Sequence, residues 1–237
     1  MSDLHSANDA LRRATARLAF SPPVAHVYRP LEYAGDVQTA YLEQYGKPRK
    51  RIVFVGMNPG PFGMVQTGIP FGEVATVRDW LKLPDSVRTP QEQHPKRPIE
   101  GFACPRSEVS GRRLWGLFAQ RFGTPEHFFE EHFVLNYCPL AFLSATGANL
   151  TPDKLPAAET TPLYAACDRH LAEVIRVLQP EWVIGVGGFA ADRAREVLTA
   201  GAPIRIGQIL HPSPASPAAN RGWAEAATRQ LQALGIW

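Results

Sequence analysis

The sequence predicts an α/β fold built around a parallel sheet. Short apolar segments alternate along the chain with longer segments of helical periodicity, which is typical of parallel strands connected by helices. Two of these segments, residues 52–56 and 182–186, are apolar throughout, as expected for strands buried on both faces. Hydrophobic residues make up 45% of the 237 and charged residues 20%, which excludes a disordered chain and allows a sizeable core.

The individual elements follow from local signals along the chain. Residues 1–20 predict an amphipathic helix that ends at Ser21-Pro22-Pro23, and residues 31–45 predict a second helix that stops near Gly46. The apolar segments predict four strands, at residues 52–56, 133–138, 182–186 and 204–210. Helical patterns cover residues 73–83, 109–122, 162–179, 188–200 and 218–234.

The proline-rich residues 84–105 lie inside a single connection between two strands, so we interpret them as a long loop and not as a domain boundary. We expect one domain over residues 1–237, with residues 1–24 forming an N-terminal helix and linker. His94 lies in the proline-rich loop and is expected to be exposed.

Composition limits the classes of partner and compartment. The chain has 25 Lys and Arg against 22 Asp and Glu, a mildly basic balance that permits nucleic acid as a partner without requiring it. Cys104, Cys138 and Cys167 lack the spacing of a disulfide framework or metal site and favour a reducing compartment. No segment resembles a signal-peptide core or membrane span. We therefore expect an intracellular monomer of the cytoplasm or nucleoid, with no membrane partner.

Candidate site residues follow the predicted strands at their carboxyl ends, where open α/β sheets bind ligands. Asn58 lies in the proline- and glycine-rich loop after the first strand, Asn136 lies toward the carboxyl end of the second strand, and His211 follows the fourth. Proline fixes φ and glycine permits close approach, so these loops are expected to be stiff. The sequence therefore predicts that two Asn and one His face a single preorganised crevice.

The chemistry expected of this crevice is limited by what its loops lack. No Asp or Glu lies in the Asn58 or His211 loops, and the nearest acidic residue is Glu73. The sequence also lacks a G-x-S-x-G elbow and a phosphate-binding P-loop. Such a site is poorly suited to ordinary general-base hydrolysis. It suits a reaction whose leaving group departs largely unaided, while the protein positions a water and stabilises a developing anion.

Three further patterns are open to a ligand-binding interpretation. Residues 185–190 match G-x-G-x-x-A between a strand and a helix, which leaves a non-catalytic nucleotide-binding protein as an alternative, although no acidic residue follows at the expected distance. His127 and His132 are spaced too far apart around a helix to share a metal ion, so no metal site is expected. Phe71, beside the crevice, is placed to stack on a planar ligand.

Two motifs closely resemble the family of single-strand-selective monofunctional uracil-DNA glycosylases. Residues 56–73 (GMNPGPFGMVQTGIPFGE) resemble its first motif, and residues 211–220 (HPSPASPAAN) are similar to its second. Shorter similarities occur at residues 92–98, 107–111 and 149–152. The resemblance implies a three-layer α/β/α fold with a central four-stranded parallel sheet. It also implies cofactor-independent hydrolysis of the bond between deoxyribose and uracil, or 5-hydroxymethyluracil, in single- and double-stranded DNA, as the first step of base-excision repair.

The resemblance assigns roles to residues in the crevice. Asn58 is expected to orient the attacking water, and His211 to donate a hydrogen bond to O2 of the departing uracil. Asn136 is expected to read the uracil edge by donating to O4 and accepting from N3–H, a pattern that cytosine reverses. Phe71 is expected to stack on the base. The side facing C5 is then lined by the backbone of Met57 and Gly60.

DNA contacts are expected around the crevice, with one departure from the family. The loop Pro214-Ala215-Ser216 stands where relatives carry a long basic residue that wedges into the duplex, so Ala215 puts activity on duplex DNA in question. Phosphate contacts are expected from Lys96, Arg97 and Arg221, with Lys82, Arg112 and Arg113 as further candidates. A broader glycosylase for deaminated bases, acting on xanthine or hypoxanthine, remains an alternative within the same superfamily.

Overall fold

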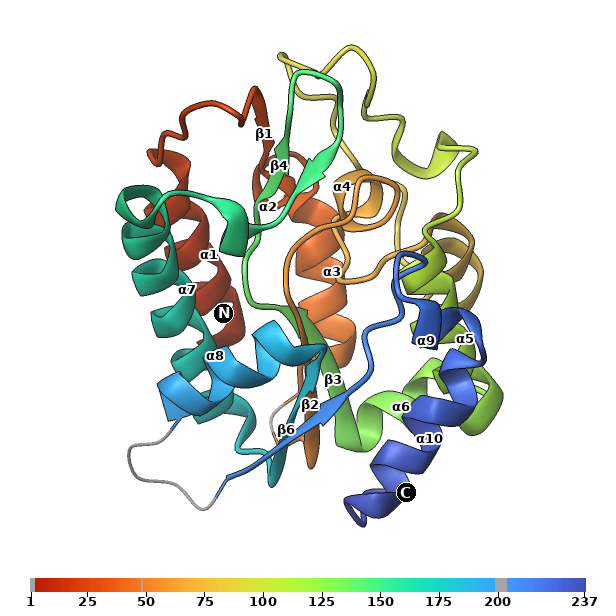
Figure 1. The fold of residues 1–237 in the computed structure, drawn as a ribbon. Coiled ribbons are helices and arrows are strands. Elements are labelled where there is room, and N and C mark those ends of the chain that lie inside the picture. The colour runs from red at the N-terminus through yellow and green to blue at the C-terminus, as the bar shows by residue number, and fades with distance from the viewer. Residues whose placement is uncertain (1–2, 48, 199–203) are drawn as a thin grey trace.

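A four-stranded parallel sheet forms the centre of the computed structural model, which describes residues 3–47, 49–198 and 204–237 (Figure 1). Its strands are β2 (Ile52–Gly56), β3 (His132–Asn136), β6 (Trp182–Val186) and β7 (Arg205–Ile209). Their spatial order is β3-β2-β6-β7, and every neighbouring pair is parallel. The chain leaves β2 toward β3 and later leaves β6 toward β7, so the order reverses between β2 and β6. Such a reversal opens a crevice at the carboxyl ends of the strands.

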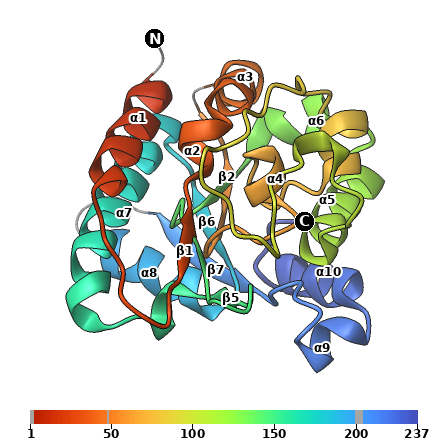
Figure 2. The ribbon, with the colours of Figure 1, turned by 90° about the horizontal axis from the view of Figure 1, so that it is seen from above.

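Helices cover both faces of the sheet, which confirms the three-layer arrangement (Figure 2). One layer contains α1 (Asp3–Ala16), α7 (Ala157–Leu178) and α8 (Gly188–Leu198). The other contains α5 (Val109–Phe122), α6 (Pro125–Glu131) and α10 (Trp223–Ala233). A single cluster of buried apolar side chains extends between the layers and draws on residues from Leu4 to Ile236. No helix in the described part of the chain is long and apolar enough to cross a membrane.

The edge strand β3 is covered by α3 (Gly35–Tyr45). Tyr41 Oη donates a hydrogen bond to the Val134 carbonyl at 2.8 Å, and its ring packs against Phe129 and Phe133. An edge carbonyl that would otherwise face outward is therefore paired, which protects the sheet from adding a further strand.

The predicted elements match the structure closely where the pattern is long. The helix at 109–122 is reproduced, and all four strands lie within two residues of their predicted limits. The first helix ends at Ala16 and not at residue 20, and the segment 31–45 is interrupted at Ala34 into α2 (Pro30–Tyr33) and α3. The predicted helix at 73–83 is helical over residues 74–80, and its last five helical residues, Thr76–Trp80, form a π-helical turn. The predicted end of the helix at 188–200 lies outside the described residues.

The last predicted helix is also divided. Residues 218–234 form α9 (Pro217–Asn220) and α10, separated at Gly222, whose φ of +124° is incompatible with a continuous helix. The predicted helix at 162–179 begins earlier, at Ala157.

A second, antiparallel sheet of order β1-β4-β5 was not predicted, because strands of two or three residues show no periodicity. Its strands are β1 (His26–Tyr28), β4 (Ala141–Leu143) and β5 (Asn149–Leu150). The proline-rich loop folds onto this sheet. Tyr28 Oη donates to the Arg97 carbonyl at 2.5 Å and accepts from the His94 N–H at 2.9 Å. The prediction that His94 is exposed was therefore wrong, since its side chain is 4% exposed and bonds the Ser144 carbonyl.

Two buried histidines make the fold sensitive to acid. His132 and His170 are 2% and 7% exposed, and burial lowers the pKa of each to about 4. In the unfolded chain a histidine has a pKa near 6.5, so the unfolded state binds more protons between these two values. The contribution of these uncharged histidines to the free energy of unfolding is therefore complete above about pH 6.5 and is lost as the pH falls toward 4.

We expect the free energy of unfolding to fall between pH 6.5 and pH 4 by roughly 1–3 kcal/mol for each of these histidines. Urea denaturation at a series of pH values measures this slope. His170→Gln removes one titration but retains a side-chain donor, so it should reduce the slope by the share of His170, while His132 and His211 still titrate. An unchanged slope would contradict the assignment.

Candidate active site

A cavity of about 570 Å³ opens at the carboxyl ends of β2, β3 and β7. Its volume lies within the range of small-molecule sites in proteins. The sequence-predicted residues that line it are Met57, Asn58, Gly60, Phe71, Asn136, His211 and Pro214. The structure therefore brings the two Asn and the one His together in a single cavity, as the sequence predicted.

The side chain of Asn58 is oriented by the neighbouring loop. Its Nδ2 donates to the carbonyl of Leu140 at 3.3 Å, which turns the amide oxygen away from that loop. The two loops are themselves joined, since the Cys138 N–H donates to the Met57 carbonyl at 2.8 Å. The amide oxygen is a weak base but a good hydrogen-bond acceptor, so it is suited to orienting a water molecule.

His211 is held as a neutral hydrogen-bond donor. The Ser213 N–H donates to Nδ1 at 3.1 Å, which places the ring proton on Nε2. Burial lowers the pKa of His211 to about 4, so the ring carries no charge near neutral pH. Its Nε2–H can therefore stabilise an anion that develops on a bound ligand without itself being charged.

Asn136 has the clearest unmet hydrogen-bonding need in the cavity. It ends β3 opposite Gly56, is 7% exposed, and donates from Nδ2 only to the sulfur of Met64 at 3.2 Å. Its Oδ1 is buried and has no partner among the described residues. A buried polar atom without a partner is costly, so this oxygen is suited to accept a hydrogen bond from a ligand N–H. A Cβ at Gly56 would lie 2.3 Å from Oδ1, so only glycine fits there.

Phe71 is fixed beside His211, with 6.0 Å between their ring centroids. Its backbone has a positive φ of +54°, which the surrounding contacts maintain. Trp115 Nε1 donates to the Pro70 carbonyl at 3.2 Å. A Cβ at Gly111 in α5 would lie 2.0 Å from the Phe71 carbonyl oxygen, so α5 approaches this loop closely because residue 111 is glycine.

A buried polar chain connects the N-terminal helix to the loop that carries Phe71. His170 Nε2 bonds Asn8 Oδ1 at 2.9 Å, and Asn8 Nδ2 donates to Gln38 Oε1 at 3.2 Å. Gln38 Nε2 in turn donates to the Gly68 carbonyl. The first helix, which the sequence alone leaves unexplained, thus supports the wall of the cavity.

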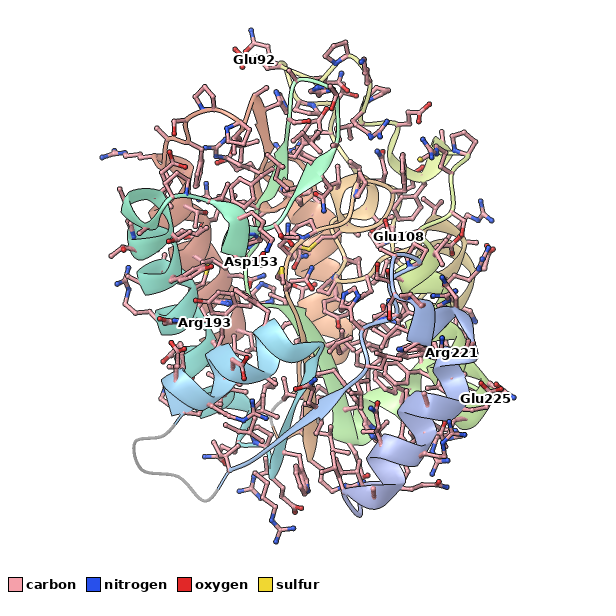
Figure 3. All side chains as sticks on the ribbon, viewed as in Figure 1. Glu92, Glu108, Asp153, Arg193, Arg221 and Glu225 are labelled. Carbon is pink, nitrogen blue, oxygen red and sulfur yellow. The ribbon has the colours of Figure 1, made fainter. Side chains whose placement is uncertain are left out.

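Glu108 is a cavity residue that sequence reasoning missed. It lies at the start of α5 (Figure 3), and its Oε2 accepts a hydrogen bond from the Phe62 N–H at 3.2 Å. Burial raises the pKa of its carboxyl above the usual value. A Cβ at Gly60 would lie 2.7 Å from Oε2, and one at Gly63 would lie 2.9 Å from Cγ. The space beside Gly60 is therefore filled by the Glu108 carboxyl.

The expectation of a site without a nearby carboxyl group was thus wrong. Glu108 is far from the Asn58 loop in sequence and is brought to it by the fold. The available signal was the similarity of residues 107–111 to the family, which gave no role for the acid.

The predicted DNA-contacting residues differ in their position relative to the cavity. Pro214 lines it, and Ala215 and Ser216 continue the same loop. This loop is braced by Arg113, which donates to the Pro212 carbonyl at 3.0 Å and to Asn220 Oδ1 at 2.9 Å. Lys96, Arg97 and Arg221 do not line the cavity; Arg221 is exposed at the end of α9, as Figure 3 shows.

Gly185 and Gly187, the two glycines of the G-x-G-x-x-A pattern, are explained by packing within the protein. A Cβ at Gly185 would lie 2.3 Å from the Ala191 nitrogen, so α8 packs directly on β6. Gly187 has a φ of +95°, and a Cβ there would lie 3.2 Å from the Cβ of His211. The motif thus supports the His211 loop, and these contacts account for its glycines without a nucleotide.

Comparisons with known proteins agree with this geometry. The family model "Uracil DNA glycosylase superfamily" matches residues 43–232. The single-strand selective monofunctional uracil DNA glycosylase of Bos taurus is 48% identical over 230 residues, which cover 97% of this chain and 83% of the relative. The Rattus norvegicus protein of the same name is 47% identical over 227 residues, covering 95% and 82%.

A crystal structure of wild-type SMUG2 from Pedobacter heparinus has the same fold, with a TM-score of 0.68, 17% identity and 97% coverage of both chains. The sequence relatives, which match nearly the whole chain, are the more specific of these findings. The chain belongs to the uracil-DNA glycosylase superfamily and, within it, to the single-strand-selective monofunctional uracil-DNA glycosylases.

Proposed function

We propose that the protein is a monofunctional DNA glycosylase that hydrolyses the N-glycosidic bond of uracil in DNA and so starts base-excision repair. The observation that carries this proposal is the unpartnered Oδ1 of Asn136, buried in the same cavity as the neutral donor His211 and the amide of Asn58. The relatives named above, which match this chain over nearly its whole length, support it.

Asn136 gives the cavity its preference for uracil. Its Oδ1 accepts from uracil N3–H, and its Nδ2 exchanges the weak contact with the Met64 sulfur for a bond to O4. Cytosine presents an acceptor at N3 and a donor at C4, so it would leave both amide atoms unsatisfied, at a cost of roughly 1–3 kcal/mol for each buried group. Phe71 stacks on the face of the base.

The bond between C1′ and N1 breaks with its electron pair leaving on uracil. The negative charge spreads onto O2, where the Nε2–H of His211 donates a hydrogen bond. The deoxyribose is left as an oxocarbenium-like cation that needs little help from a base. Asn58 holds the water that adds to C1′ and loses a proton to solvent. The uracil anion takes up a proton, so the products are free uracil and an abasic site in an unbroken strand.

The base reaches the cavity only after it leaves the stack, which costs a few kcal/mol in a duplex and less in a single strand. Ala215 is too small to fill the gap that remains, so we expect single-stranded DNA to be processed faster than duplexes. Pro214 and Ser216 would contact the strand beside Ala215, and Lys96, Arg97 and Arg221 its phosphates. We extend the proposed substrates to 5-hydroxymethyluracil and propose an intracellular monomer.

A single-turnover assay tests the proposal. The protein is incubated with a labelled single strand that contains one deoxyuridine, and with its U·G and U·A duplexes, before abasic sites are cleaved with alkali. Alkali-dependent cleavage at the uracil is the expected result. Cleavage at xanthine or hypoxanthine but not at uracil would favour the broader deaminated-base glycosylase. A rise in melting temperature with free dinucleotide, without any cleavage, would favour the nucleotide-binding alternative.

Asn136→Asp should lower kcat/KM for uracil by roughly 10- to 100-fold, because a carboxylate accepts from N3–H but cannot also donate to O4. Single-turnover rates at several enzyme concentrations measure this loss. Gln120→Glu makes the same amide-to-acid change at an exposed position in the last turns of α5 and should leave the rate unchanged. Unaltered uracil kinetics in Asn136→Asp would count against its role.

A further inference from the structure

Three segments of the chain meet at the edge of the cavity around one aromatic ring. Phe62 comes from the loop after β2, Arg97 from the proline-rich loop, and Arg106 from the residues just before α5. The guanidinium carbon of Arg106 lies 3.9 Å from the centroid of the Phe62 ring, and that of Arg97 lies 5.4 Å from it. Phe62 and Arg106 both line the cavity.

This cluster is positively charged. Among the described residues, neither guanidinium has an Asp or Glu oxygen within the 4.0 Å of an ion pair. The carboxyl of Glu108 holds the Phe62 backbone in place, and the same burial that raises its pKa favours the uncharged form. Two like charges are thus kept against one ring without an ion-pair partner among the described residues.

Stacking on Phe62 occupies one face of each guanidinium group. Arg97 Nη1 donates to the Lys96 carbonyl at 2.8 Å and its Nε is buried, so its N–H groups are partly used within the protein. The N–H edges of Arg106 form no hydrogen bond with a described residue. Those edges match the geometry of phosphate oxygens, which arginine binds with two parallel hydrogen bonds. Arg106 is exposed, and no described residue forms a hydrogen bond or an ion pair with its guanidinium, so these edges are accessible.

We propose that Arg106, together with Arg97 on Phe62, forms a binding site for one backbone phosphate of the DNA strand, adjacent to the nucleotide in the cavity. This inference rests on the proposed function, because the strand must cross the cavity for its neighbouring phosphate to reach Arg106. The 213–216 loop contains no basic residue, so this site supplies charge that the loop lacks. A contact to phosphate needs no complementary strand and therefore serves single-stranded DNA directly.

Salt dependence of binding tests the proposal. In the full chain carrying Asn58→Ala, which slows excision, the Kd for a single strand with one deoxyuridine is measured from low to high NaCl. Adding Arg106→Ala should weaken binding roughly tenfold and reduce the slope of log K against log[salt] by about 0.7, the value expected when the protein neutralises one phosphate fewer. Arg106→Gln, which keeps much of the side-chain length, should give the same reduction.

Arg195→Ala is the matched control. Arg195 is an exposed arginine in the last turn of α8, paired with Asp192 at 2.6 Å, and α8 runs away from the carboxyl ends of the strands. Its removal should leave the slope unchanged. Equal salt slopes in the Asn58→Ala and Asn58→Ala/Arg106→Ala proteins would overturn the proposal.

A scan with uncharged methylphosphonates locates the contact. One phosphate of the strand is replaced at a time. Replacing the phosphate bound by Arg106 should weaken DNA binding by the Asn58→Ala protein but not by the Asn58→Ala/Arg106→Ala protein. Equal losses in both proteins at every position would also overturn the proposal. The proposed function is tested separately, by uracil excision with the unmodified chain. If uracil is excised but the salt slope does not change when Arg106 is removed, only the phosphate site is refuted. If the salt slope depends on Arg106 but uracil is not excised, only the glycosylase function is refuted.

Discussion

Asn58→Ala should slow single-turnover excision of uracil by roughly 10²- to 10⁴-fold, the usual range for loss of a group that positions or activates a reactant. The amide of Asn58 is fixed by its bond to the Leu140 carbonyl, so its oxygen presents one direction to a water molecule. Alanine leaves that water unoriented while the pocket for the base is retained. The affinity for uracil-containing DNA, measured by fluorescence anisotropy, should therefore stay within about twofold of the original.

The binding measurement separates this interpretation from a general disturbance of the site. Loss of affinity in parallel with loss of rate would show that Asn58 supports the pocket and does not act on the water. A melting temperature close to that of the unmodified chain is expected, because the bond to Leu140 is long at 3.3 Å and only partly buried.

His211→Ala should slow excision by roughly 10²- to 10³-fold, the effect typical of removing one donor to a developing oxyanion. Because Nδ1 accepts from the Ser213 N–H, the imidazole donates from Nε2 while it is uncharged. Since the pKa of His211 is about 4, protonation of this residue should cause no change in rate between pH 5.5 and 8. Single-turnover rates across this range measure both expectations.

His127→Ala provides the control for His211. His127 is an exposed histidine on α6, outside the cavity lining, and its removal should leave excision unchanged. If Asn58→Ala and His211→Ala both kept full activity, the assigned mechanism would be wrong. Their effects should also be less than additive in the double variant, because both act on the same transition state.

The parts of the fold that the sequence predicted are those with long, regular patterns. The continuous apolar segments at 52–56 and 182–186 are central strands, since only the interior of a parallel sheet buries both faces of a strand. The small antiparallel sheet could not be predicted, because its strands are too short for any pattern and pair across segments far apart in the sequence.

The residues of the site also fall into a group that the sequence predicted and a group that it did not. Asn58 and His211 closely follow predicted strands, and Asn136 lies at the carboxyl end of another, so the topology alone places them at one edge. Glu108 and Arg106 follow no strand. They reach the cavity because α5 starts beside the Asn58 loop, which depends on how α5 packs and not on any local pattern. The exposure of His94 was wrongly predicted for a related reason. This polar loop residue is buried because the loop packs against Tyr28, which is distant in the sequence.

The close contact between Gly60 and Glu108 links the variation tolerated at two distant positions. Any side chain at residue 60 would occupy the place of the Glu108 carboxyl, which would have to swing out and release the Phe62 N–H. A shorter residue at 108 would make room but would leave that N–H unbound. A substitution at either position alone therefore removes the hydrogen bond to the Phe62 N–H. We expect a larger residue at position 60 to be accepted only with a compensating replacement at position 108. Searches for variants with altered base preference should randomise the two positions together.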